Sequence, residues 1–164
     1  MEFGASIRLN SVSGIRFYTN VNKEKISELR AQGYTVELGT LISPKDLIGD
    51  NELTFDLDST DYVDVPFESE KYFEQGDFSG VVGSIIDIKP ENITREFVGR
   101  GYAKITKDGV TTIEYANYHN SDIANNSRTL AYVAYMFKND ATSFYGDLAT
   151  NIKELVDSWA KKYN

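Results

Sequence analysis

Hydrophobic and polar residues alternate over several short runs of the first half of the chain, and this period of two predicts β-strands. The runs span residues 7–9, 15–19, 34–42, 53–57, 63–67 and 78–88. Turn-like residues separate the first two runs, so we expect a hairpin. The last run is nearly continuous in apolar character, as in strands covered on both faces, and we expect it at the sheet centre.

Helical periodicity appears once near the start of the chain and twice near its end. Asn22 can cap a short helix over residues 23–32, which Gly33 would follow in a left-handed conformation. Ser127 can cap a second helix over residues 128–139. A third helix is expected over residues 144–162, with one apolar stripe for the core. The stripe consists of Leu148, Ile152, Leu155 and Trp159.

Residues 96–118 predict a second hairpin around Lys107-Asp108-Gly109. A three-residue loop there separates apolar from polar side chains better than a two-residue loop does. We therefore expect Thr106 to pair with Val110, because a one-residue slip would move every side chain to the other face. The polar face would then carry Arg100, Tyr102, Glu114 and Tyr118.

These elements predict an α+β fold: a mostly antiparallel β-sheet with two C-terminal helices and one short N-terminal helix packed on it. The 164 residues fit one domain, which we place at residues 7–164. Residues 1–6 have the character of an expression-vector remnant.

Composition narrows the possible partners. The formal net charge of −8 disfavours binding to nucleic acid, since phosphate backbones would be repelled. The absence of cysteine removes thiolate metal sites, disulfides and cysteine nucleophiles. No apolar run approaches the roughly 18–20 residues that a membrane helix needs, so we expect no membrane insertion.

Motifs for catalysis and for metal binding are weak. His119, the single histidine, has Ser121 and Asp122 as neighbours, but catalytic triads are assembled from distant parts of a chain. Acidic residues at 56, 58, 61 and 64 could hold Ca²⁺, but the glycine and distal glutamate of an EF-hand loop are missing. We therefore expect no enzyme activity, no cofactor and no metal site.

The polar hairpin face is the candidate ligand site. A tyrosine ring next to Arg and Glu can stack on a sugar and orient its hydroxyl groups. Arg100, Tyr102, Glu114 and Tyr118 are the predicted ligand-binding residues. Ordinary cross-strand packing of Tyr102 with Glu114 and Lys104 is the competing interpretation.

Five segments together resemble a module that recurs in large multidomain surface and secreted proteins of anaerobic gut and rumen Firmicutes. They are Ser13–Phe17, Val36–Pro44, Gly83–Ile85, Arg95–Tyr102 and Asn126–Leu130. Such modules often stand beside carbohydrate-active domains. The resemblance implies an extracellular or cell-surface location and an accessory role, with neighbouring modules of the same polypeptide as partners.

Two functions therefore follow from the sequence. The first is a non-catalytic accessory module that binds a polysaccharide or a cell-surface glycan. The second is a structural or protein-interaction module, a spacer or adhesin unit without a glycan ligand. A hydrolase is the least favoured class, because motifs for nucleophilic catalysis are missing.

Overall fold

The computed structural model describes residues 5–69, 71–117 and 127–163. Its strands are β1 (Ala5–Arg8), β2 (Gly14–Asn20), β3 (Thr35–Pro44), β4 (Val63–Pro66), β5 (Phe73–Gln75), β6 (Phe78–Ile86), β7 (Phe97–Lys107) and β8 (Val110–Tyr115). Its helices are α1 (Lys23–Ala31), α2 (Lys45–Ile48), α3 (Leu130–Asn139) and α4 (Thr150–Ala160), with 3-10 turns at Pro90–Asn92 and Phe144–Asp147. The α+β fold class is confirmed.

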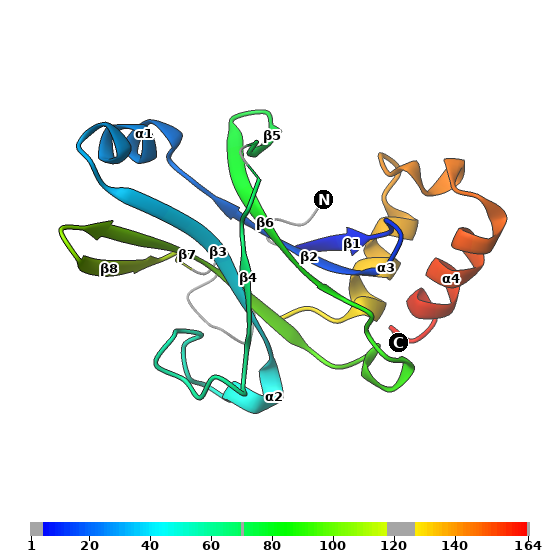
Figure 1. Ribbon diagram of the computed structural model, residues 1–164. Helices are drawn as coiled ribbons and strands as arrows, with labels where there is room; N and C mark the ends of the chain where they lie inside the picture. The colour runs from blue at the N-terminus through cyan, green and yellow to red at the C-terminus, as the bar shows by residue number, and fades with distance from the viewer. Residues whose placement is uncertain (1–4, 70, 118–126, 164) are drawn as a thin grey trace.

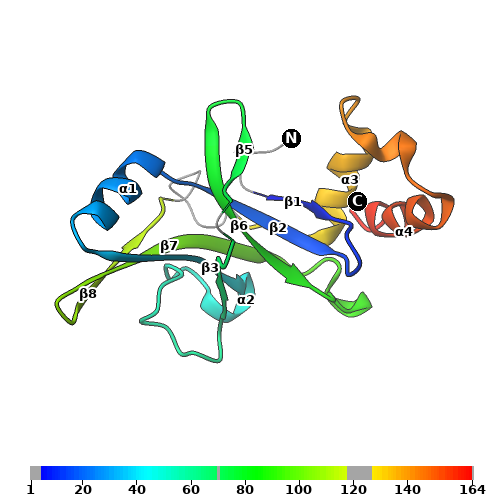
Figure 2. The ribbon, with the colours of Figure 1, turned by 45° about the horizontal axis from the view of Figure 1, so that its top comes forward.

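In the described residues the strands form two antiparallel sheets, where one sheet was expected. Sheet A has the order β1-β2-β6-β5, and sheet B has the order β4-β3-β7-β8. Figure 2 shows β2 and β6 of sheet A lying across β7 and β3 of sheet B. The run expected at the sheet centre is β6, an interior strand of sheet A.

Glycines let the two sheets approach closely. A Cβ atom on Gly99 of β7 would lie 2.7 Å from Cβ of Phe17 on β2, and one on Gly101 would lie 2.6 Å from Cβ of Thr19. Real Cβ atoms essentially never approach so closely. The small residues that the sequence places on one face of β7 therefore receive side chains of the other sheet.

Helices α3 and α4 pack together beside β1, the edge strand of sheet A (Figure 1). Leu130 and Val133 of α3 join Val156 and Trp159 of α4 in a buried core cluster, which also contains apolar side chains of β1 and β2. Trp159 is 7% exposed, so its predicted burial is confirmed. Among the described helices, none is long and apolar enough to cross a membrane.

Helix α1 begins as predicted, whereas α3 and α4 begin later than the sequence indicated. The Asn22 side chain accepts a hydrogen bond from the Lys25 amide, and Gly33 has a φ of 85°. Thr129 caps α3, while the Ser127 hydroxyl donates to Glu96. Extended backbone at residues 148–149 separates the 3-10 turn from α4, so the predicted helix over 144–162 is interrupted.

Two further expectations about local structure are wrong. Residues 53–57 form no strand but a loop, and the short helix α2 lies where no helical periodicity was recognised. Strand β1 begins at Ala5, which is buried, so it includes the last two residues of the segment 1–6. The vector origin of that segment stays a prediction.

Candidate functional site

The β7–β8 hairpin has a two-residue loop, which corrects the predicted three-residue loop. Lys107 pairs with Val110, and Tyr102 pairs with Tyr115. Asp108 and Gly109 have φ values of 52° and 78°, as in the type I′ turn that suits the twist of a two-stranded ribbon. Relative to the prediction, every β8 side chain therefore lies on the opposite face.

This register separates the predicted ligand-binding residues. Glu114 lies opposite Ala103, so it points away from the face that carries Arg100 and Tyr102. Tyr118 lies outside the described residues. The structure thus brings together only Arg100 and Tyr102 of the predicted set, and the ligand-binding role of the four residues stays a prediction.

Tyr102 lies beneath the loop that was predicted to be a strand. It is 6% exposed, and its ring contacts that of Phe55 edge-on, with 4.9 Å between the ring centroids. Its hydroxyl donates to Asp64 Oδ1 at 2.7 Å. Burial, followed by the hydrogen bond to the Asp64 carboxylate, raises the pKa of Tyr102 far above its usual range. The Tyr102 phenol therefore stays neutral, and its ring forms part of a buried packing cluster.

Arg100 is enclosed in the same way. Its Nε donates to the Ala116 carbonyl at 2.8 Å, and its Nη1 donates to Glu52 at 3.1 Å. The guanidinium lies 5.0 Å from the centre of the Tyr115 ring. The polar hairpin face is therefore a protein-internal network covered by residues 52–62. The apolar residues at positions 53, 55 and 57 indicated a segment that packs on other residues, but their alternation is equally typical of a half-buried strand.

Replacement of Tyr102 by Phe tests this network. We expect Tyr102→Phe to lower the free energy of unfolding by about 1–2 kcal/mol, because a buried hydrogen bond to a carboxylate is lost. Chemical denaturation at neutral pH measures the change. Since the raised pKa favours the neutral phenol in the fold, this contribution is full below pH about 10 and falls as the pH rises further. Equal stability of both proteins at neutral pH would contradict the assignment.

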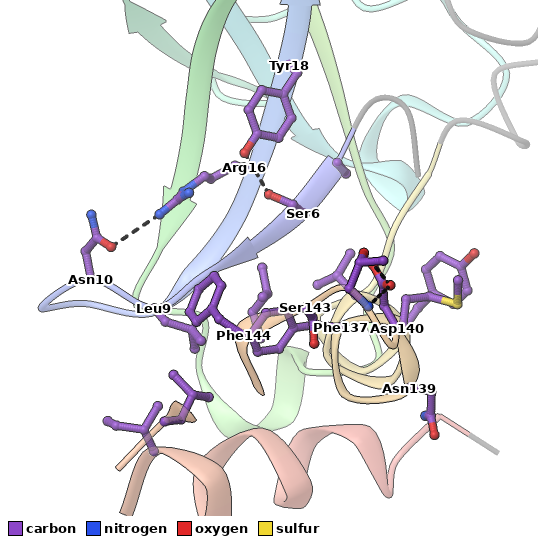
Figure 3. A pocket seen from close by; sticks show the side chains of 18 of the residues that line it. Ser6, Leu9, Asn10, Arg16, Tyr18, Phe137, Asn139, Asp140, Ser143 and Phe144 are labelled. Atoms are coloured by element: carbon purple, nitrogen blue, oxygen red, sulfur yellow. Dashed lines mark hydrogen bonds between the residues drawn. The ribbon is translucent and has the colours of Figure 1, made fainter. Parts of the chain in front are cut away.

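A groove of about 760 Å³ lies between the outer face of β1 and β2 and the end of α3 (Figure 3). The segment 139–144, which connects α3 with the 3-10 turn, closes one side of the groove. This volume is within the range of roughly 300–1,000 Å³ typical of small-molecule sites. The groove is therefore the candidate functional site.

The strand wall of the groove carries several polar groups. Ser6 Oγ and the Tyr18 hydroxyl lie 2.9 Å apart, within hydrogen-bond distance. Arg16 donates from Nη2 to Asn10 Oδ1 at 3.3 Å, and Figure 3 shows its side chain directed toward Asn10. Ser6, Arg16 and Tyr18 share this face because side chains at alternate positions of a strand point the same way.

The helix wall is mainly apolar. Phe137 and Phe144 meet edge-on with ring centroids 5.0 Å apart, and Leu148 and Ile152 continue the surface. Phe144 is 59% exposed, so one large ring is open to a ligand. This wall offers the apolar contact area that most ligand sites use for affinity.

Asp140 stands on the side of the groove away from Arg16 (Figure 3). Hydrogen bonds from the Thr142 hydroxyl and the Thr142 amide to Asp140 Oδ1 lower the pKa of this carboxyl, which stays ionised near neutral pH. The groove thus has a cationic end and an anionic end. Across the described residues, no group of three or more His, Cys, Asp or Glu side chains is placed to hold a metal ion.

Sequence reasoning did not find this groove. One wall comes from β1 and β2 and the other from α3, which follows them by more than a hundred residues along the chain. Only tertiary packing brings these walls together. The one signal in the sequence was Phe144, an aromatic residue of the predicted last helix that does not belong to its apolar stripe.

Comparison with protein-family profiles, with curated proteins and with solved structures finds no match for this chain. The geometry and chemistry of the groove are therefore the basis for proposing a function.

Proposed function

We propose that this protein is a non-catalytic accessory module that binds a glycan in the groove between β1–β2 and α3. The observation that carries the proposal is one wall of open aromatic surface facing a second wall of hydrogen-bonding groups. We further propose that the module belongs to a secreted or cell-surface multidomain protein, as the resemblance of its sequence motifs implies.

The groove chemistry fits a sugar ring. The exposed Phe144 ring can stack on the apolar face of a pyranose, while Asn10, Ser6 and Tyr18 can exchange hydrogen bonds with hydroxyl groups. Each of these polar side chains combines donor and acceptor capacity, as a sugar hydroxyl does. The proposal moves the ligand from the covered hairpin face to this open groove.

Binding without turnover is favoured by the charges that line the groove. Glycoside hydrolysis generally needs two carboxyl groups on either side of the scissile bond. Of the groove-lining side chains that the structure describes, Asp140 supplies the single carboxylate, and its Oδ1 is engaged by Thr142. This arrangement lacks the second carboxylate for an acid–base pair.

A protein-interaction role is the second candidate, and an apolar surface next to the groove favours it. Tyr135, Met136 and Tyr163 are 39%, 39% and 42% exposed. The Tyr163 ring lies 5.0 Å from the rings of both Tyr132 and Tyr135, which creates a joint aromatic patch. Tyrosine and methionine are enriched at protein interfaces, so a neighbouring module could dock here.

A Phe144→Ala variant tests the glycan proposal. We expect at least one polysaccharide to retard the wild-type protein in affinity gels. Phe144→Ala should weaken the affinity for that polysaccharide about tenfold, which is equivalent to about 1.4 kcal/mol. Calorimetry with the same polysaccharide measures the change. The ring is largely solvent-exposed, so the variant should remain folded.

Val110→Ala is the matched control, because Val110 is 69% exposed at the tip of the β7–β8 hairpin and does not line the groove. It should bind as the wild type does. Failure of a broad glycan array and of affinity gels to return any ligand would remove the glycan proposal and favour the protein-interaction role.

A further inference from the structure

Arg16 is a partly buried cation on the strand wall of the groove, and like Arg8 it differs from the cations of this protein that are paired with carboxylates. Lys23, Arg95 and Lys138, which are also partly buried, each lie 2.8 Å from a carboxylate oxygen. Within the described residues, the Arg16 guanidinium donates one side-chain hydrogen bond, which goes to the neutral side chain of Asn10. The cation therefore has no carboxylate partner in that part of the chain.

The missing carboxylate leaves Arg16 available to a ligand, because a guanidinium has five N–H donors and a carboxylate can accept from two of them at once. Arg16 occupies one of these donors in a bond of 3.3 Å, near the long limit for a hydrogen bond. The net charge of −8 shows that carboxylates are abundant in this chain, yet none of those in the described residues pairs with Arg16. Arg16 thus retains unused capacity for an anion at the groove wall.

Arg8 adds positive potential at the same end. Arg8 lies on the same face of β1 as Ser6, which pairs with Arg16 of β2. Its Nη1 donates to the backbone carbonyls of Asn10 and Val12. Among the residues that the structure describes, these carbonyls leave the charge of Arg8 uncompensated, so Arg8 and Arg16 together make this end of the groove cationic. Asp140 lies toward the other side (Figure 3), so an anionic group is favoured at the Arg16 end alone.

We propose that Arg16 binds a carboxylate of the ligand, so that the groove selects an acidic polysaccharide, one with uronic acid residues, over its neutral counterpart. This inference rests on the proposed function and specifies its ligand. The planar guanidinium can meet a carboxylate through two parallel N–H···O bonds, and Asn10 beside it can donate from its amide nitrogen. The Phe144 ring then contacts the apolar face of a sugar.

The test compares two forms of one polymer: a polyuronate with free carboxylates and the same polymer with its carboxyl groups methyl-esterified. Calorimetry on the whole chain should show that wild-type protein binds the free acid about tenfold more tightly than the ester. Arg16→Gln should remove this difference by weakening binding of the acid alone. Arg16→Lys should retain part of the preference, since it keeps the charge but loses the planar fork.

Arg30→Gln is the matched control, because it removes the same charge from α1, at the end of the molecule away from α3 and α4 (Figure 1). It should leave the acid preference unchanged. A sulfated polysaccharide serves as a further ligand and should bind less tightly than the polyuronate.

Other outcomes separate the two proposals. Equal binding of acid and ester by the wild type would overturn the carboxylate assignment and leave the glycan proposal intact. If Arg16→Gln weakens the binding of both polymers equally, the role of Arg16 is merely structural, and the carboxylate assignment is overturned too. Stronger binding of the sulfated polymer would assign the anion as sulfate instead. Failure to bind any of the three polymers would overturn the carboxylate assignment, whereas the glycan proposal itself is decided by the broad glycan array.

Discussion

Replacement of Trp159 by Ala is expected to lower the free energy of unfolding by roughly 3–5 kcal/mol, as for other large aromatic side chains removed from a core. Trp159 is 7% exposed on α4 and belongs to the core cluster shared with α3, β1 and β2. Chemical denaturation followed by circular dichroism measures the loss. Because α3 forms one wall of the groove, this packing also positions the candidate site.

Leu155→Ala provides the control on the same helix. Leu155 is 38% exposed, so its removal leaves little cavity and should cost clearly less than the loss of Trp159. Since Trp159 is the single tryptophan, native fluorescence reports its environment directly. A native emission spectrum typical of a solvated indole, or equal costs for the two variants, would contradict the described packing of α4.

A Gly99→Val variant is the second change with a large expected effect. The new Cβ and methyl groups would overlap the Phe17 ring, which is 4% exposed between the two sheets. Overpacking of this kind typically costs about 1–3 kcal/mol, and valine at a site without room even for Cβ should reach the upper part of that range. The midpoint of chemical denaturation should fall accordingly.

Gly146→Ala is the matched control, because a Cβ there would meet no heavy atom within 4 Å and the backbone needs no left-handed conformation. It should leave stability nearly unchanged or raise it slightly. If the Phe17 ring is the source of the clash, a Phe17→Ala, Gly99→Val double variant should lose less stability than the sum of the losses in the two single variants. Additive losses in the double variant would argue against this contact.

The hairpin around Asp108 shows where sequence reasoning failed. The three-residue loop was chosen because it separates apolar from polar side chains, and that choice assumed that one face of β7 meets solvent. Instead, β7 is covered on both faces: sheet A packs on the side of Gly99, and residues 52–62 cover the side of Tyr102. With both faces covered, the preference of Asp-Gly for a type I′ turn decides the register.

Features that depend on neighbours along the chain could be predicted from the amino-acid sequence alone. Alternation and helical periodicity located most strands and helices, Asn22 and Gly33 marked the two ends of α1, and the apolar stripe placed Trp159 in the core. These features are local, because a cap or a stripe is set by residues within a few turns of backbone.

Three features could be seen only in the three-dimensional structure: the division into two sheets, the cover over Arg100 and Tyr102, and the groove at Arg16. Each of these depends on contacts between segments far apart in the sequence, such as Phe17 against Gly99 and β1 beside α3. Spacing along the chain does not encode which distant surfaces meet. Whether a polar side chain becomes a ligand site or part of a buried network follows from that packing, since the packing sets its exposure to solvent.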